Sequence, residues 1–144
     1  MCRGDCDVYE DDLVLGAVRY QITLPQSAET VWDHIGDPAE QAKWVPDFAE
    51  TVVEGTTRTI TTVSGLTFNE ELLVVDPVLR RIQYRVDLPV LTFHRGTLDV
   101  IALDDSSCVA VYATDTDPRI MALVIGAVTF RALVELGRQM EEMN

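Results

Sequence analysis

Residues 117–143 decide the fold, and they read Asp-Pro-Arg-Ile-Met-Ala-Leu-Val-Ile-Gly-Ala-Val-Thr-Phe-Arg-Ala-Leu-Val-Glu-Leu-Gly-Arg-Gln-Met-Glu-Glu-Met. Asp117 is a favourable N-cap and Pro118 suits the first helical position, so a helix is predicted to begin here. The run from Ile120 to Phe130 carries no charge. It is shorter than the ~20 residues that span a membrane, and it is too apolar for a helix with one face in water. The sequence therefore predicts a long helix whose first turns are covered on most sides.

The apolar residues of this predicted helix fall on two faces, each recurring at three- and four-residue steps. The first face comprises Ile120, Leu123, Ala127, Phe130 and Val134, and the second comprises Met121, Val124, Ile125 and Val128. One sheet covers only one face, and each large apolar side chain left in water forgoes ~1.5–3 kcal/mol. We therefore expect the second face to be covered by earlier helices around Trp32 and Trp44 or by a second copy of the chain. Both a monomer and a homodimer remain open.

The middle of the chain is predicted to be a series of strands. Alternation of apolar and polar residues from Val18 to Leu24 indicates a strand with one buried face, which Pro25 ends. Ser64-Gly65 is a signal for a two-residue hairpin loop. Short turns link successive strands, so the sheet is predicted to be antiparallel. Six further strands are expected at residues 48–54, 58–63, 66–75, 80–87, 93–103 and 108–116.

Two short helices are predicted between the first and second strands. Ser27 caps the first, whose apolar residues are Val31, Trp32 and Ile35, and Gly36 closes it. Residues 37–40 read Asp-Pro-Ala-Glu, which combines an N-cap, a proline at the first position and the glutamate of a capping box. The second helix is expected to end at residues 44–46. The order of elements is thus β-α-α-β6-α, an α+β arrangement.

Composition limits the classes of partner. At 144 residues the chain has the length of one domain, which we expect over residues 13–144, after an acidic tail at 1–12 that is predicted to be flexible. A net charge of −13 argues against nucleic acid and anionic membranes as partners. Stable membrane insertion is not expected, because no apolar run is long enough.

The cysteines predict neither a disulfide framework nor a metal site. An odd count of three, without a signal peptide, predicts reduced thiols and a cytoplasmic location. Cys2 and Cys6 could supply half of a metal site, but no second pair of cysteines exists, and His34 and His94 lie in unrelated segments. We therefore predict no bound metal. No nucleotide-binding or other cofactor signature occurs, so no cofactor is predicted.

Several short motifs, in this order and at this spacing, carry a resemblance to a known family. They are Trp32 followed by Asp37, Lys43-Trp44-Val45-Pro46, Gly55-Thr-Thr-Arg58, Glu70 six residues before Asp76-Pro77, Arg80-Arg81-Ile82-Gln83-Tyr84, Thr97-Leu98-Asp99-Val100, and Asp117-Pro118 before the last helix. Over residues 18–140 the chain resembles the START/SRPBCC superfamily, and within it the polyketide cyclase/dehydrase and lipid-transport group.

This resemblance implies the helix-grip fold, in which a curved antiparallel sheet of about seven strands surrounds a long C-terminal helix. It also implies a deep cavity for apolar or aromatic small molecules between sheet and helix. The chain departs from the family pattern at Glu71, where a basic residue is frequent, at Tyr112, where tryptophan is common, and at Thr116, where phenylalanine is common. The family shares no catalytic set, so no catalytic residue is carried over.

Polar residues among apolar neighbours are candidates for the site. Glu70 shares strand parity with Phe68 and Leu72, and an inward-facing Glu70 would need a partner or a raised pKa. Arg95 and Arg58 are the alternative partners, and we expect Glu70 and Arg95 to lie near one another on the concave face. Aromatic residues from separate segments suit a pocket wall. The predicted ligand-binding residues are Trp44, Phe68, Glu70, Tyr84, Phe93, Arg95, Tyr112, Met121 and Ile125.

Two functions follow as hypotheses. The first is binding, transport or sequestration of a hydrophobic small molecule, such as a lipid or a polyketide. The alternative is a cyclase or dehydratase that folds a polyketide-like or aromatic substrate into a reactive pose, with Glu70, His94 or Tyr84 as candidate catalytic residues that move protons. Sequence leaves open whether the protein is an enzyme. An interaction module that dimerises through the helix is a third possibility.

Overall fold

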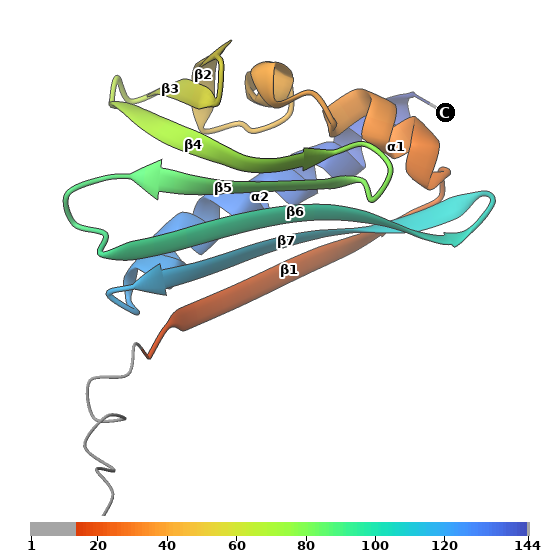
Figure 1. Cartoon of the computed structure of the whole chain (residues 1–144). Helices are drawn as coiled ribbons and strands as arrows, with labels where there is room; N and C mark the ends of the chain where they lie inside the picture. The colour runs from red at the N-terminus through yellow and green to blue at the C-terminus, as the bar shows by residue number, and fades with distance from the viewer. Residues whose placement is uncertain (1–13, 144) are drawn as a thin grey trace, which may run out of the picture.

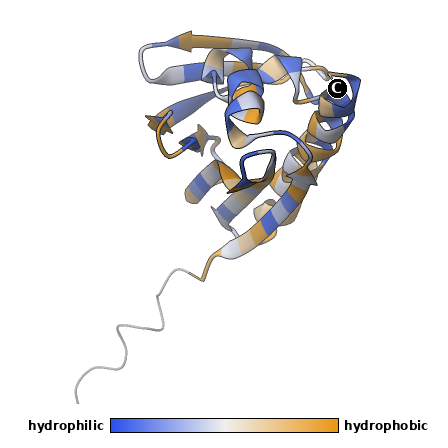
Figure 2. Cartoon of the chain, turned by 90° about the vertical axis from the view of Figure 1, so that its right-hand side faces the viewer, coloured by the Kyte–Doolittle hydropathy of each residue, from blue (hydrophilic) through white to orange (hydrophobic). Residues whose placement is uncertain are grey.

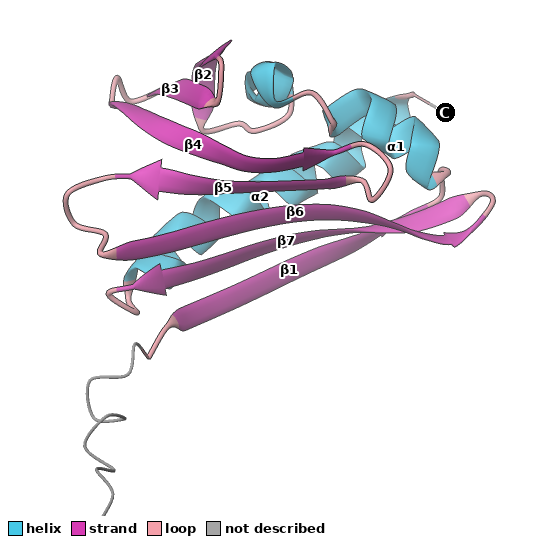
Figure 3. Ribbon diagram, in the orientation of Figure 1, coloured by secondary structure: helices cyan, strands magenta, loops and turns pink. Residues whose placement is uncertain are grey.

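The computed structural model describes residues 14–143, and within them it has one sheet and one long helix. The predicted order of elements and the α+β helix-grip fold are confirmed (Figures 1 and 3). The predicted acidic tail lies outside the described residues, as do Cys2 and Cys6. The elements are β1 (Gly16–Leu24), α1 (Ala28–Ile35), η2 (Pro38–Lys43), β2 (Phe48–Glu54), β3 (Thr57–Thr62), β4 (Thr67–Asp76), β5 (Arg81–Asp87), β6 (Phe93–Asp104), β7 (Ser107–Asp117) and α2 (Met121–Glu142).

The sheet has seven antiparallel strands in the order β1-β7-β6-β5-β4-β3-β2. Strands β2 to β7 each lie beside the next in sequence, and β1 joins the edge beside β7. Figure 1 shows α2 running behind β5, β6 and β7, so the helix lies across one face of the curved sheet. Apolar and polar residues alternate along the strands (Figure 2). This alternation places Ile82, Tyr84 and Val86 of β5 in the core while their neighbours face outward.

The loop between β3 and β4 is longer than predicted. β3 ends at Thr62 and β4 begins at Thr67, so four residues form the turn instead of two. Gly65 has φ of 92°, a left-handed conformation that favours glycine. The Thr62 amide donates to the Leu66 carbonyl at 2.8 Å, and the Leu66 amide donates to Thr62 Oγ1 at 3.0 Å, so the four residues close on themselves.

The first short helix forms as predicted, and the second is tighter than an ordinary α-helix. Ser27 caps α1 by accepting a hydrogen bond from the Thr30 amide at 3.1 Å. Asp37 accepts from the Ala39 amide at 2.9 Å, but the six residues that follow form a 3-10 helix. Glu40 does not complete a capping box, because its carboxylate accepts instead from Lys43 Nζ at 2.5 Å.

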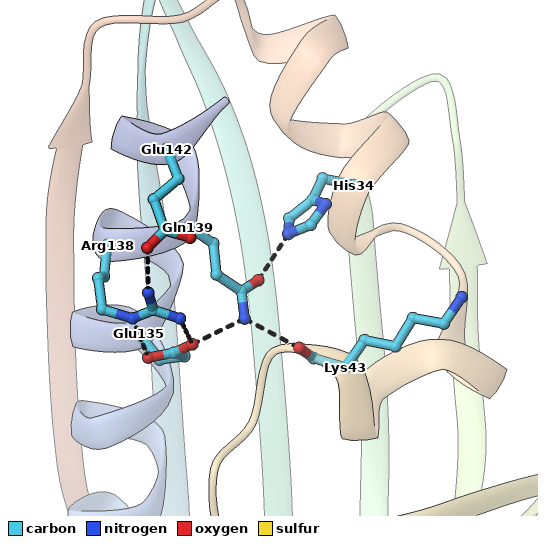
Figure 4. Close-up of polar contacts among 6 residues, drawn as sticks. All are labelled: His34, Lys43, Glu135, Arg138, Gln139 and Glu142. Atoms are coloured by element: carbon cyan, nitrogen blue, oxygen red, sulfur yellow. Dashed lines mark hydrogen bonds and ion pairs between the residues drawn. The ribbon is translucent and has the colours of Figure 1, made fainter. Parts of the chain in front are cut away.

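Polar contacts between the early helices and α2 lie near the C-terminal end of α2 (Figure 4). Gln139 donates to the Lys43 carbonyl at 2.9 Å and contacts the His34 ring at 2.7 Å. Gln26 also donates to the Met140 carbonyl at 3.0 Å. Glu135 joins this cluster through Arg138 and Gln139. The contacts fix the end of the helix against α1 and η2, and they leave its first half without such cover.

The beginning of α2 differs from the prediction. Asp117 is not the N-cap, and Pro118 is not the first helical residue, because the helix begins at Met121 after Ile120, which makes no side-chain cap. Asp117 instead remains in β7 opposite Phe93, and its carbonyl accepts from the Thr92 amide at 2.9 Å. Pairing with β6 thus extends the strand past the residue that local preference assigns to the helix.

Small residues form the face of α2 that packs against the sheet in its first half. These small residues are Ala122, Gly126 and Thr129, and the buried face continues in the second half with Ala132, Leu133, Leu136 and Met140. A Cβ on Gly126 would stand 3.1 Å from Val18, so the missing side chain allows the helix to lie close to β1. The expected covering of the second apolar face by the early helices is wrong at Val124, which is more than half exposed, and Leu123 of the first face is more than half exposed as well. The early helices lie too near the other end to reach them.

Candidate functional site

An apolar cavity of about 380 Å³ lies between the sheet and the first half of α2. Phe68, Tyr84 and Tyr112 contribute from the sheet, and Met121 and Ile125 contribute from the helix. The four-residue loop between β3 and β4 lies at one edge with Val63 and Leu66, which are both more than half exposed. The half-exposed Val124 also lines the cavity, so the open apolar face of α2 continues into its wall. An apolar space with a few polar groups is the usual form of a site for small molecules.

Two buried tyrosines form the polar part of the wall of this cavity, and they also line a small void beside Gln41 and Arg58. Tyr84 on β5 and Tyr112 on β7 have their hydroxyl oxygens 2.9 Å apart. Gly96 of β6 lies between these strands, opposite Tyr84 on one side and Thr114 on the other. A Cβ on Gly96 would overlap the ring of Tyr84, so glycine is required for the ring to reach across β6. Gln41 of η2 completes the group by donating to the Tyr112 hydroxyl at 2.8 Å.

A count of hydrogens shows that the tyrosine pair can donate to a ligand. The two hydroxyls carry two hydrogens, and only one of these can lie between the two oxygens. Gln41 uses its own N–H, so it occupies a lone pair of Tyr112 and no hydroxyl hydrogen. With the Gln41 amide in this orientation, the other hydroxyl hydrogen of the pair has no partner among the described residues, and neither does Gln41 Oε1. Burial raises the pKa of Tyr112 to about 12 and raises that of Tyr84 well above its usual value, so both are protonated donors at neutral pH.

A buried ion pair between Arg58 and Glu70 lies beside the ring of Tyr84. Arg58 Nε donates to Glu70 Oε2 at 2.6 Å, and Nη2 approaches the same oxygen to 2.5 Å. Both side chains are almost fully buried, and β3–β4 pairing places them directly opposite one another. The Arg58 guanidinium lies 4.8 Å from the centre of the Tyr84 ring. Burial raises the pKa of Glu70, and the positive charge of Arg58 counters this by favouring the carboxylate.

The His94 side chain supplies a hydrogen-bond acceptor at a place where β5 and β6 no longer pair. Pairing of β5 with β6 stops at Tyr84 opposite Gly96, so the next inward-facing position has no strand partner. The Val86 amide donates instead to His94 Nδ1 at 3.0 Å. Burial, with a smaller contribution from the charge of Arg95, lowers the pKa of His94 to about 4. The ring is therefore neutral at pH 7, with its hydrogen on Nε2.

The structure brings five of the nine predicted ligand-binding residues into the wall of the apolar cavity, namely Phe68, Tyr84, Tyr112, Met121 and Ile125. Trp44 lies behind it, with its ring centre 5.9 Å from that of Tyr112. Glu70 is paired with Arg58, which is one of the two partners that the sequence offered for it. Of the three catalytic candidates, only Tyr84 lines the apolar cavity, whereas Glu70 and His94 line a polar groove.

The expected proximity of Glu70 and Arg95 on the concave face is wrong. Gly96 faces the buried ring of Tyr84, so alternation along β6 turns Phe93 and Arg95 to the outer face of the sheet. Arg95 lies 6.0 Å from the centre of the Phe93 ring on that side. Strand parity identified residues that share a face but could not say which face was inside.

Three residues at the site, Gln41, Gly96 and Phe48, were not predicted from the sequence. Gln41 lies in the 3-10 helix, and nothing in its local sequence distinguishes it from a surface glutamine. Gly96 offers a signal, because a glycine within a strand marks a place where another group approaches closely. Phe48, whose ring centre lies 6.4 Å from that of Phe68, also lines the cavity.

Comparison with known proteins agrees with this architecture. The family described as polyketide cyclase/dehydrase and lipid transport matches residues 16–140. No curated protein shows significant sequence similarity to the chain. Among the described residues, no helix has the length and apolar character needed to cross a membrane.

Solved structures share the fold at low sequence identity. The protein XoxI from Bacillus cereus has a TM-score of 0.82 at 17% identity, covering 89% of this chain and 97% of its own. A START superfamily protein from Mycobacterium smegmatis has a TM-score of 0.73 at 14% identity, covering 89% and 99%. The ZhuI aromatase/cyclase from a Streptomyces species has a TM-score of 0.71 at 20% identity, covering 89% and 94%. The fold inferred from sequence is thereby confirmed.

Proposed function

The chain belongs to the polyketide cyclase/dehydrase and lipid-transport family, and from this premise we propose that it binds a hydrophobic small molecule carrying an oxygen acceptor. The apolar part of the ligand occupies the cavity between the sheet and α2. Its acceptor, a ketone or phenol oxygen, takes the free hydrogen of the Tyr84–Tyr112 pair. The observation that supports the proposal is the buried tyrosine pair, with one hydroxyl hydrogen that has no partner among the described residues, in the wall of a largely apolar space.

The polar part of the wall favours binding over acid–base catalysis. Tyr84 and Tyr112 remain protonated at neutral pH, so neither serves as a base. Asp47 is the one carboxylate among the described lining residues, and Arg131 holds both of its oxygens at 2.6 and 2.8 Å. A cyclase or dehydratase is the second candidate function. The hydroxyl donor of the tyrosine pair favours this second function in one respect, because such a donor could polarise a substrate carbonyl and stabilise the negative charge that develops on its oxygen.

The test compares two ligands of nearly the same shape. Acetylnaphthalene carries a carbonyl oxygen where ethylnaphthalene carries only hydrogen. A net hydrogen bond contributes ~0.5–1.5 kcal/mol, so the ketone is expected to bind up to about tenfold more tightly. Tyr84→Phe and Tyr112→Phe are each expected to reduce this preference. Tyr20→Phe is the matched control, because the Tyr20 ring packs on Phe130 at 5.3 Å, away from the cavity lining.

Equal affinity for the two ligands in the native protein would refute the role of the tyrosine pair. Failure of both to bind would refute the cavity as the site. Covalent conversion of a polyketide-like ketone, followed by mass spectrometry of the product, would favour the second candidate function.

A further inference from the structure

A second hollow, of about 540 Å³, lies where β5 and β6 separate, and residues from both faces of the sheet line it. We call it the outer groove, and its walls come from the end of β5, the start of β6, the loop at 88–92 and the neighbouring part of β3 and β4. It shares Val86 and Leu88 with the apolar cavity, so these two side chains divide the two spaces. The lining of the outer groove is mainly polar, unlike that of the apolar cavity.

The charges of the outer groove are nearly balanced. Glu70 is paired with Arg58, and the Glu71 carboxylate is paired with Arg85. Asp87 has no ion-pair partner among the described residues, and its side chain is exposed. An anionic ligand would meet three carboxylates in this space, whereas a cationic ligand would meet the guanidinium of Arg85. The groove therefore disfavours an anion, and its one unpaired carboxylate can accept hydrogen bonds from a neutral ligand.

The groove also contains a hydrogen-bond donor without a partner. His94 lines it and is only 1% exposed. Its Nδ1 accepts from the Val86 amide, so Nε2 carries the hydrogen, and Nε2 has no partner among the described residues. A buried donor left without an acceptor costs ~1–3 kcal/mol. Asp87 presents the opposite chemistry, because a carboxylate only accepts. A group that both donates and accepts satisfies the two.

Apolar surface completes the groove. Leu91 and the half-buried ring of Phe93 line it beside the polar groups. The ring offers a flat face on which C–H groups can pack. Hydroxyl groups carried on a saturated ring combine all of these requirements: they are neutral, they donate and accept, and the ring presents C–H groups on its faces.

We propose that the outer groove binds a neutral, hydroxyl-rich ring, such as a sugar or a cyclic polyol, with His94 Nε2–H donating to one hydroxyl and Asp87 accepting from another. The ring packs against Phe93. This site is separate from the apolar cavity, and its occupation does not depend on the ligand proposed there.

The test uses nuclear magnetic resonance of the full chain, with methyl glucoside, methyl galactoside and myo-inositol as probes. The chain has two histidines, and His34 serves as an internal control because its ring contacts Gln139 of α2. At least one probe is expected to shift the His94 ring signals and the Val86 amide in a saturable way, and to leave His34 unchanged. Asp87→Asn is expected to weaken this binding about tenfold. Asp105→Asn, an exposed acid in the turn between β6 and β7, is the matched control and is expected to have no effect.

The proposal is overturned if none of the three probes moves the His94 signals, or if Asp87→Asn and Asp105→Asn bind the probe equally well. Acetylnaphthalene is titrated into the same samples. If acetylnaphthalene binds and no sugar or polyol does, only the proposal for the outer groove is refuted. If a sugar or polyol binds and acetylnaphthalene does not, only the function proposed for the apolar cavity is refuted.

Discussion

Acidification is expected to destabilise the protein through His94. The ring is held neutral, with its pKa lowered to about 4 from the ordinary value of 6.5. The unfolded chain takes up the proton at higher pH than the folded chain, so the stability that His94 contributes is fully present above pH 6.5 and is lost as the pH falls towards 4. From the two pKa values, the free energy of unfolding falls by about 2 kcal/mol between about pH 7 and about pH 5, and by roughly 3 kcal/mol by about pH 4.

The assay is urea unfolding at a series of pH values, followed by tryptophan fluorescence, for the native chain and for His94→Asn. The asparagine amide oxygen stands near the position of Nδ1 and can still accept from the Val86 amide, but it does not titrate. Glu70, whose raised pKa acts in the opposite direction, is present in both proteins and cancels in their difference. The native protein is expected to lose about 2 kcal/mol more than the variant between about pH 7 and about pH 5. Parallel pH profiles would refute the reasoning that His94 is buried in its neutral form.

Three further perturbations follow from the site. Arg58→Met leaves the buried Glu70 without its partner and is expected to lower the free energy of unfolding in urea by ~3–5 kcal/mol. The double variant Arg58→Met/Glu70→Leu is expected to recover most of this loss. An equal loss in the single and double variants would contradict an ion pair between these residues. Gly96→Ala is expected to displace the Tyr84 ring, to lower the free energy of unfolding by ~1–3 kcal/mol and to abolish the preference for acetylnaphthalene over ethylnaphthalene. Gly55→Ala is the control: it lies at an open turn with φ of 62°, so it is expected to lower stability without changing that preference. Val124→Ser is expected to change thermal stability little in a monomer, because the side chain is 56% exposed, so a large fall in melting temperature that depends on protein concentration would show that a second chain covers this face.

Local patterns in the sequence determined the elements of the fold. Alternation along residues 18–24 and the turn signals between the later segments predicted seven strands, and β2 has the predicted bounds of 48–54. Ser27 and the apolar positions after it predicted α1, and the uncharged run from Ile120 predicted the long helix. These features depend on residues a few positions apart, so they can be recognised in a single segment. The helix start at Asp117 was wrong because pairing with β6, made by residues far away in sequence, kept that residue in a strand.

Only the tertiary structure decided which residues of the site contact one another. The β3–β4 register places Arg58 opposite Glu70, whereas Arg95 faces the other side of the sheet. Tyr84 and Tyr112 were both predicted to line the pocket, but their contact depends on Gly96 in the strand between them. Small residues, and not the large apolar ones, face the sheet from the first half of α2. The physical reason is that strand parity defines two faces without saying which is inside, and the relative register of distant strands is set only when the whole sheet closes around the helix.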